Sequence, residues 1–104
     1  MTKARDRAIG SFTTTAVSSN ITLVPFTNYM VDTTTSRSLT LPAAPNTGDE
    51  IHIFDVSGQA GTNNITVNNN GLKVAGSLQS LVIDKNYAAA VLVYTGSTYG
   101  WRVS

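Results

Sequence analysis

Short runs rich in Val, Ile and Thr recur about every 8–12 residues along this chain, with Gly, Pro, Asn and Ser between them. β-Branched side chains lose χ1 freedom in a helix but pack well on a pleated sheet. The runs are about four to seven residues long, a length that suits strands rather than helices. The pattern predicts an all-β domain, built as a small sandwich, a barrel or a β-prism-like fold.

Ten segments have this strand character. They are residues 12–17, 20–24, 29–33, 38–41, 50–56, 64–68, 72–75, 80–84, 88–94 and 100–103. Asn70-Gly71 is a signal for a type I′ turn and predicts a hairpin that pairs residues 65–67 with 72–74. Only residues 2–9 have the character of a short helical turn. Residues 19–23 and 63–67 are alike, but one such pair does not indicate a repeat fold.

Composition and charge exclude several classes of function. The chain has no Cys, which excludes a disulfide framework, a thiolate metal site and a Cys nucleophile. Its 7 Lys and Arg residues against 6 Asp and Glu give a net charge of +1, short of the basic excess typical of nucleic-acid-binding domains. With 41% hydrophobic residues and no apolar run near the roughly 20 that span a bilayer, we expect a folded protein without a membrane segment.

Positive charge is concentrated near the N-terminus, where Lys3, Arg5 and Arg7 stand against Asp6. We therefore divide the chain into an N-terminal arm, residues 1–11, and a single all-β domain, residues 12–104. Exposed cations on such an arm can pair with carboxylates of a partner protein. The alternative is that they are only solvated, as charges near chain ends commonly are.

His52 is the one imidazole of the chain, and Glu50 lies on the same face of the predicted strand 50–56. Such a pair can act as a base or as half of a metal site. The sequence offers no Gly-x-Ser-x-Gly motif and no second His or Cys to complete a triad or a zinc site. The segment 58–61 also lacks the Lys-Ser/Thr ending of a phosphate-binding loop. We expect a structural role for His52, and a protein without enzymatic activity, metal or cofactor.

Four aspartates stand at predicted strand ends or turns: Asp32, Asp49, Asp55 and Asp84. A short carboxylate at such a position accepts hydrogen bonds from nearby backbone N–H groups. The alternative is a small glycan-active enzyme, which needs two carboxylates facing each other across a cleft. With 6 acidic residues in all, we expect the aspartates to hold turns.

Three aromatic residues near the C-terminus, Tyr94, Tyr99 and Trp101, stand among Thr, Ser and Gly. Together they are a candidate platform for binding a glycan. The alternative is that Trp101 anchors the core of the last strand. We favour the core role, because Trp101 and Val103 share one face of that strand.

The predicted strand 50–56 is apolar on both faces, with Ile51 and Ile53 on one side and His52 and Phe54 on the other. The predicted strand 88–94 is similarly continuous. A small two-layer domain covers only one face of each sheet, so the second face needs another cover. We therefore expect an obligate oligomer.

A set of motifs in the second half of the chain points to a family. The motifs are Leu39-Thr40-Leu41-Pro42-Ala43-Ala44-Pro45, Thr47-Gly48-Asp49-Glu50-Ile51-His52-Ile53-Phe54-Asp55, Gly58, Asn63-Asn64-Ile65-Thr66-Val67, Gly71, Ala75-Gly76, Tyr87, Val91-Leu92-Val93-Tyr94 and Trp101. In their order and spacing, residues 39–103 resemble a module common in virion proteins of tailed bacteriophages, especially tail fibres and small head-surface proteins. Residues 2–9 resemble a short segment of phage fibre chains, with Arg7 in place of the expected apolar residue.

The resemblance implies an all-β, usually homotrimeric, non-enzymatic virion protein. Because the chain has no shaft repeat, we expect a capsid decoration (cement) protein that binds the major capsid protein through Lys3, Arg5 and Arg7. The alternative is a short tail fibre or fibre knob that binds a host-surface glycan through Tyr94, Tyr99 and Trp101. Either role places the protein in the virion, with no nucleic-acid or membrane partner.

Overall fold

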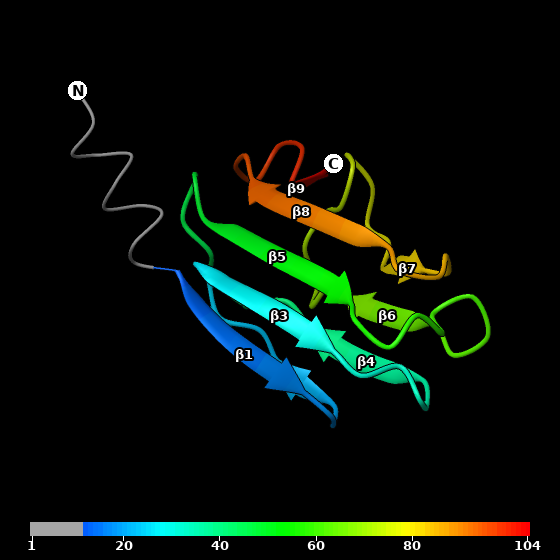
Figure 1. Ribbon diagram of the computed structural model, residues 1–104. Helices are drawn as coiled ribbons and strands as arrows, with labels where there is room; N and C mark the ends of the chain where they lie inside the picture. Colours follow the sequence, from blue (N-terminus) through cyan, green and yellow to red (C-terminus); the bar gives the residue numbers. More distant parts are fainter. Residues whose placement is uncertain (1–11) are drawn as a thin grey trace.

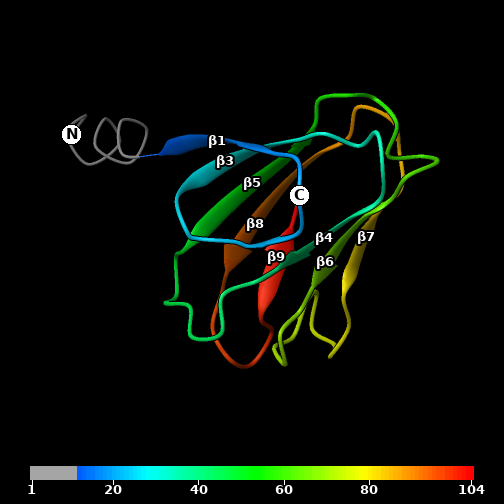
Figure 2. The same ribbon diagram turned by 90° about the horizontal axis from the view of Figure 1, so that it is seen from below.

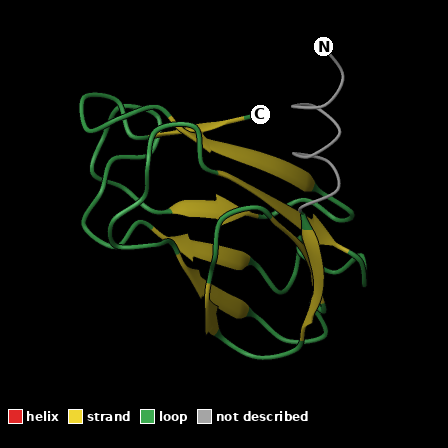
Figure 3. Ribbon diagram, turned by 90° about the vertical axis from the view of Figure 1, so that its left-hand side faces the viewer, coloured by secondary structure: helices red, strands yellow, loops and turns green. Residues whose placement is uncertain are grey.

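The computed structural model describes residues 12–104, which form nine β-strands in two mixed sheets and contain no helix (Figures 1 and 3). A five-stranded sheet has the order β1-β3-β5-β8-β9, and a four-stranded sheet has the order β2-β4-β6-β7. The strands are β1 (Thr13–Val17), β2 (Ile21–Thr22), β3 (Thr27–Val31), β4 (Arg37–Thr40), β5 (Glu50–Asp55), β6 (Ile65–Asn68), β7 (Leu81–Ile83), β8 (Ala89–Tyr94) and β9 (Trp101–Val103). The predicted all-β class is confirmed.

The two sheets lie in separate layers with one hydrophobic core between them (Figure 2). Ile51, Ile53 and Leu92 enter the core from the five-stranded sheet, and Leu39 and Val67 enter it from the four-stranded sheet. All five side chains are fully buried. Both sheets stay open in residues 12–104, with β1 and β9 as the edges of the larger one, so the barrel alternative is wrong.

The first six strands alternate between the two sheets, so that the chain winds like a coil. As a result β1, β3 and β5 are parallel neighbours in one sheet, and β2, β4 and β6 are parallel neighbours in the other. Thr13 pairs with Thr27 and Thr27 with Ile51, so successive turns of the coil differ in length. Because the turns differ in length, the sequence shows no fixed repeat, and the parallel pairing of the strands could not be predicted from it.

The likeness of residues 19–23 to 63–67 is not a structural repeat. Both segments contribute to the four-stranded sheet, as β2 and β6. Ile21 and Val67 are both in register with Leu39, whereas the sequence similarity aligns Ile21 with Ile65. The two segments are therefore offset by two residues, and their likeness reflects common strand chemistry.

The predicted hairpin across Asn70-Gly71 is wrong, although its turn forms. Both residues have positive φ (51° and 79°), and the N–H of Leu72 donates to the carbonyl of Asn69 at 3.0 Å. The strand that pairs with β6, however, is β7, and residues 72–75 are not a strand. A second tight turn follows at once, because Val74 and Ser77 bond each other through both backbone groups.

Residues 73–76 instead lie along the free edge of β9. The N–H of Trp101 donates to the carbonyl of Lys73 at 2.9 Å, and the N–H of Ala75 donates to the carbonyl of Trp101 at 2.8 Å. This close approach depends on Gly100, which has φ 75° and whose added Cβ would lie 1.9 Å from the Lys73 carbonyl oxygen. The segment thereby satisfies an edge that would otherwise be exposed.

Replacing Gly100 by Ala should open this edge. We expect Gly100→Ala to lower the free energy of unfolding by about 3–4 kcal/mol, because backbone strain and a clash with backbone act together. Gly48→Ala is the control: its φ is 97° but no atom lies within 4 Å of the added Cβ, so only the strain of about 1–2 kcal/mol applies. Urea denaturation measures both, and equal losses would contradict the clash.

Candidate functional site

The predicted capsid-binding residues Lys3, Arg5 and Arg7 lie outside the described residues. The described part of the chain begins at Phe12, just before β1. The Phe12 ring packs edge-on against Phe26, with centroids 5.6 Å apart, and lies 4.8 Å from the ring of His52. The first described residue of the chain therefore lies beside His52.

The three predicted aromatic residues do not form a common binding platform. Trp101 is fully buried and Tyr94 is nearly so, and their rings pack in the core with centroids 5.2 Å apart. The indole N–H of Trp101 has no hydrogen-bond partner among the described residues, so this side chain stabilises the fold by packing. Tyr99 is 65% exposed. The core role expected for Trp101 is confirmed, and Tyr99 alone of the three presents its ring to solvent.

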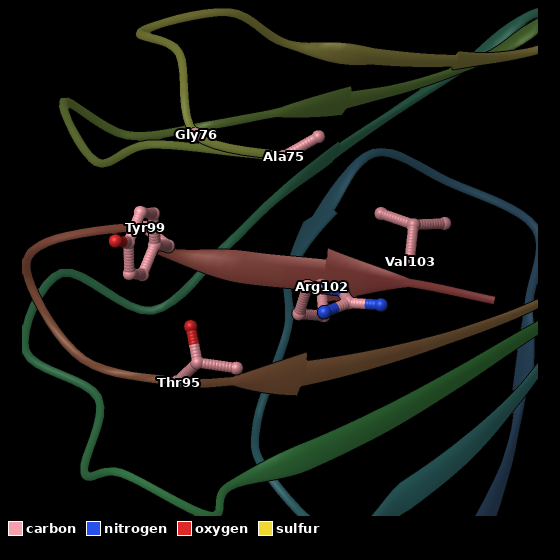
Figure 4. Close-up of a pocket in the computed structure, with 6 residues that line it drawn as sticks. All are labelled: Ala75, Gly76, Thr95, Tyr99, Arg102 and Val103. Atoms are coloured by element: carbon pink, nitrogen blue, oxygen red, sulfur yellow. The ribbon is translucent and has the colours of Figure 1, made fainter.

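Tyr99 lines a pocket of about 430 Å³ at the end of the five-stranded sheet. Figure 4 shows its other walls: Ala75 and Gly76 from the turn beside β9, Thr95 after β8, and Arg102 and Val103 from β9. The volume falls in the range of about 300–1,000 Å³ that is usual for small-ligand sites. A hydroxyl, a guanidinium and an aromatic ring around one hollow suit a polar ligand with an apolar face.

His52 is held by polar neighbours on both sides. Its Nδ1 lies 2.8 Å from the amide oxygen of Asn28 on β3, and its Nε2 bonds the carboxylate of Glu50 on its own strand. Residues 12–104 contain no group of three or more His, Asp or Glu placed to hold a metal ion. The imidazole side chain is 22% exposed and lies on the outer side of the sheet. The arrangement orients His52 within a surface.

Three of the four aspartates hold turns as predicted. Asp32 accepts the Thr34 N–H at 2.8 Å, and Asp49 accepts the Asn46 N–H at 2.9 Å. The Thr34 hydroxyl and N–H, more than the nearby Arg37 guanidinium, hold the pKa of Asp32 below its ordinary value. The third, Asp55, lies at the end of β5, and Asp84 is exposed after β7.

Asp55 is buried at the end of β5, where its carboxylate collects four donors. These are the Thr33 hydroxyl at 2.6 Å and the N–H groups of Gly58, Ala60 and Tyr87 at 2.9, 3.0 and 2.8 Å. Burial alone would raise the pKa of Asp55, but these hydrogen bonds outweigh it and hold the pKa below its ordinary value. A charged carboxylate thereby joins three loops of the chain, at residues 33, 58–60 and 87.

Replacing Asp55 by Asn removes the charge and turns an NH₂ group toward backbone donors. We expect Asp55→Asn to lower the free energy of unfolding by about 2–4 kcal/mol near neutral pH. Because the pKa is lower in the folded state, the stabilisation by the carboxylate is complete above the unfolded pKa of about 4 and is lost as pH falls through the folded pKa. Urea denaturation from about pH 7 to pH 3 should show the gap between wild type and variant shrinking. A gap that stays constant would contradict this role.

The outer faces of the two sheets differ sharply in character. Apolar side chains on the five-stranded sheet alternate with its buried ones and point outward: Ala16, Met30, Phe54, Ala89, Val91 and Val93. On the four-stranded sheet the corresponding side chains are uncharged and mostly polar: Asn20, Thr22, Ser38, Thr40, Thr66 and Asn68, with Val82 of β7 as an exposed apolar residue among them. The sheet facing the viewer in Figure 1 therefore has the character of a protein contact surface.

The predicted division of strand 50–56 into two faces is confirmed, with Glu50 and His52 as polar members of the outer one. Ile51 and Ile53 are fully buried in the core, and His52 and Phe54 are partly buried on the outer face. Asn28 and Met30 were not predicted as part of this surface; the parallel pairing of β3 with β5 places them beside His52 and Phe54. The alternation of polar and apolar residues along β3 was the available signal, but the neighbour of that strand could not be predicted.

No protein-family model and no curated protein matches the chain. Within residues 12–104, no helix has the length and apolar character needed to cross a membrane. The apolar outer face and the Tyr99 pocket are thus the two candidate functional surfaces of the described domain.

Proposed function

We propose that the chain is a structural protein of a bacteriophage virion that decorates the capsid surface as a homotrimer. The resemblance of residues 39–103 to phage virion modules supports the virion role. The observation that carries the assembly role is the contrast between the apolar outer face of the five-stranded sheet and the polar outer face of the other sheet. The outer face of the five-stranded sheet is suited to contact with a protein partner, and that of the four-stranded sheet is suited to exposure to solvent.

In this role the N-terminal arm makes the contact with the shell. Lys3, Arg5 and Arg7 pair with carboxylates of the major capsid protein, each pair contributing about 0–1 kcal/mol. Three arms on one trimer act together, so that weak contacts add up to firm attachment by avidity. Phe12, the first described residue after the arm, packs against Phe26 and His52.

The proposed role is non-enzymatic, and the side chains of Asp49, Asp55 and His52 have structural hydrogen-bond partners. The carboxylates of Asp49 and Asp55 hold turns, and the two ring nitrogens of His52 face Asn28 and Glu50. These groups are oriented by each other and by backbone donors.

Removing the cations of the arm tests the attachment. Capsids of the virus that encodes the chain, assembled without it, are mixed with purified protein and sedimented. We expect Lys3→Gln, Arg5→Gln and Arg7→Gln combined to weaken binding at least about tenfold, because every copy loses its ion pairs. Lys73→Gln with Lys85→Gln, which removes charge from the body, should bind like wild type. Unchanged binding of the triple variant would contradict the role of the arm.

A second candidate is a short tail fibre or fibre knob that binds a host-surface glycan. The observation in its favour is the exposed Tyr99 ring beside the pocket with Thr95 and Arg102 (Figure 4). An aromatic ring stacks on the apolar face of a sugar, and the flanking polar groups bond its hydroxyls. With Tyr94 and Trp101 in the core, Tyr99 is the residue that makes this contact.

Tyr99→Ala separates the two candidates. For a glycan-binding fibre, the variant should lose binding of the fluorescently labelled protein to host cells by about tenfold or more, with capsid binding unaffected. Tyr87→Ala is the matched control, because Tyr87 is similarly exposed, at 72%, and does not line the pocket. If Tyr99→Ala binds cells like wild type, the fibre role through this pocket is excluded.

A further inference from the structure

We propose that the pocket beside Tyr99 binds an acidic sugar, with the sugar carboxylate on Arg102 and a sugar ring on Tyr99. The pocket has a volume of about 430 Å³, and none of the described residues that line it carries a carboxylate. This inference rests on the second candidate of the proposed function, because it names the class of glycan and the residue that selects it.

Arg102 brings a positive charge to the pocket that no described acid neutralises. It is exposed on β9, and within residues 12–104 no carboxylate oxygen lies within 4.0 Å of its guanidinium. Val93 pairs with Glu50 on one side and with Arg102 on the other, so Glu50 lies two strands away, and its carboxylate bonds His52. A planar guanidinium matches a carboxylate through two parallel N–H···O bonds. The pocket is therefore suited to a ligand that carries a carboxylate.

A second cation lies next to the pocket. The ammonium group of Lys73 donates to the carbonyl of Thr98 at 3.1 Å, in the loop that leads to Tyr99. Two positive charges at one end of the sheet raise the local concentration of anionic ligands. A neutral sugar gains nothing from either charge.

The other polar groups of the pocket specify a ligand with hydroxyl groups and a ring. The hydroxyl of Thr95 donates to the carbonyl of Gly100 at 2.6 Å, so toward the pocket its oxygen acts as an acceptor for a ligand O–H. Tyr99 is 65% exposed and offers its ring for stacking. In Figure 4, Tyr99 and Arg102 lie at successive points along β9, with Thr95 on the side of β8. A carboxylate, hydroxyl groups and a ring in one ligand describe a sugar of the uronic-acid type.

The turn that forms one wall of the pocket has an unfavourable backbone conformation. Ala75 has φ 53° and Gly76 has φ 84°, and no atom lies within 4 Å of a Cβ added to Gly76. Asn adopts a positive φ more readily than Ala, but its amide group would extend into space that the Ala methyl leaves open. Backbone strain of this kind clusters at binding sites. The turn thus keeps the pocket open at a cost in stability.

Matched pairs of acidic and neutral oligosaccharides test the proposal. Trigalacturonic acid is compared with galactotriose, and sialyllactose with lactose, by titration into ¹⁵N-labelled protein followed by NMR. We expect at least one acidic sugar to shift the amide signals of residues 75–76, 95, 99 and 102 and to bind about tenfold more tightly than its neutral partner. The proposal is overturned if neither acidic sugar shifts these signals, or if acidic and neutral partners bind equally.

Substitutions of Arg102 test its role in selecting the acid. Arg102→Gln should lower the affinity for the acidic sugar about tenfold, to that of the neutral one, and Arg102→Lys should lie between, because it keeps the charge without the paired donors. Lys85→Gln is the matched control: it removes an exposed cation that does not line the pocket and should bind like wild type. Equal losses in Arg102→Gln and Lys85→Gln would show a general effect of charge and overturn the site. Circular dichroism confirms that each variant folds.

Substitutions of Ala75 give an independent test. Ala75→Asn should raise the urea midpoint, because Asn tolerates the positive φ, and should lower the affinity for the acidic sugar about tenfold by filling the pocket. Ala75→Gly relieves the same strain without filling the pocket and should keep the wild-type affinity. An Ala75→Asn variant that binds the sugar like wild type would overturn the placement of the ligand against this turn.

Cell binding separates this inference from the proposed function. If Tyr99→Ala loses cell binding and Arg102→Gln does not, the fibre candidate stands and the acidic sugar is overturned. If the pocket binds an acidic sugar but the protein does not bind host cells, the inference stands and the fibre candidate fails. Binding of wild-type protein to capsids is a separate result, because the N-terminal arm makes that contact in the proposed decoration role.

Discussion

The buried carboxylate of Asp55 holds together the loops at one end of three neighbouring strands, β3, β5 and β8. The backbone ladder of these strands ends where the loops begin, so the loops themselves are held together by side-chain hydrogen bonds. Asp55 does this by accepting from Thr33, from Gly58 and Ala60, and from Tyr87. Because the bonds form to a charged group, each is stronger than a neutral hydrogen bond and favours one arrangement of the loops.

Features set by neighbouring residues were predictable, and features set by distant pairing were not. Alternation along each segment predicted the strands, the core role of Trp101 and the two faces of β5. The parallel winding depends on turns of unequal length, which leave no period in the sequence. The wrong hairpin shows the same limit: the turn at Asn70 forms, but a second turn with Ala75 at φ 53°, a rare conformation for Ala, removes the expected partner strand.

The outer face of the five-stranded sheet likewise combines features that the local sequence predicts with features that depend on distant strand pairing. The outward residues of β5 could be read from local alternation, whereas the pairing of His52 with Asn28 required the parallel register with β3. On the outer face of the five-stranded sheet, the hydrogen-bonded side chains of His52, Asn28 and Glu50 lie among apolar residues. The outer face of the four-stranded sheet carries mostly uncharged polar residues. In the proposed function this division of character is what favours assembly, because an apolar surface whose polar groups already bond each other is suited to burial against a protein partner.

Cryo-electron microscopy tests the account most directly. Capsids assembled without this chain are incubated with the purified protein and reconstructed. The account predicts trimers at regular three-fold positions on the shell, with the N-terminal arms against the capsid. Shells without added density, or density on the tail alone, would contradict the decoration role, and bound single chains would contradict the trimer.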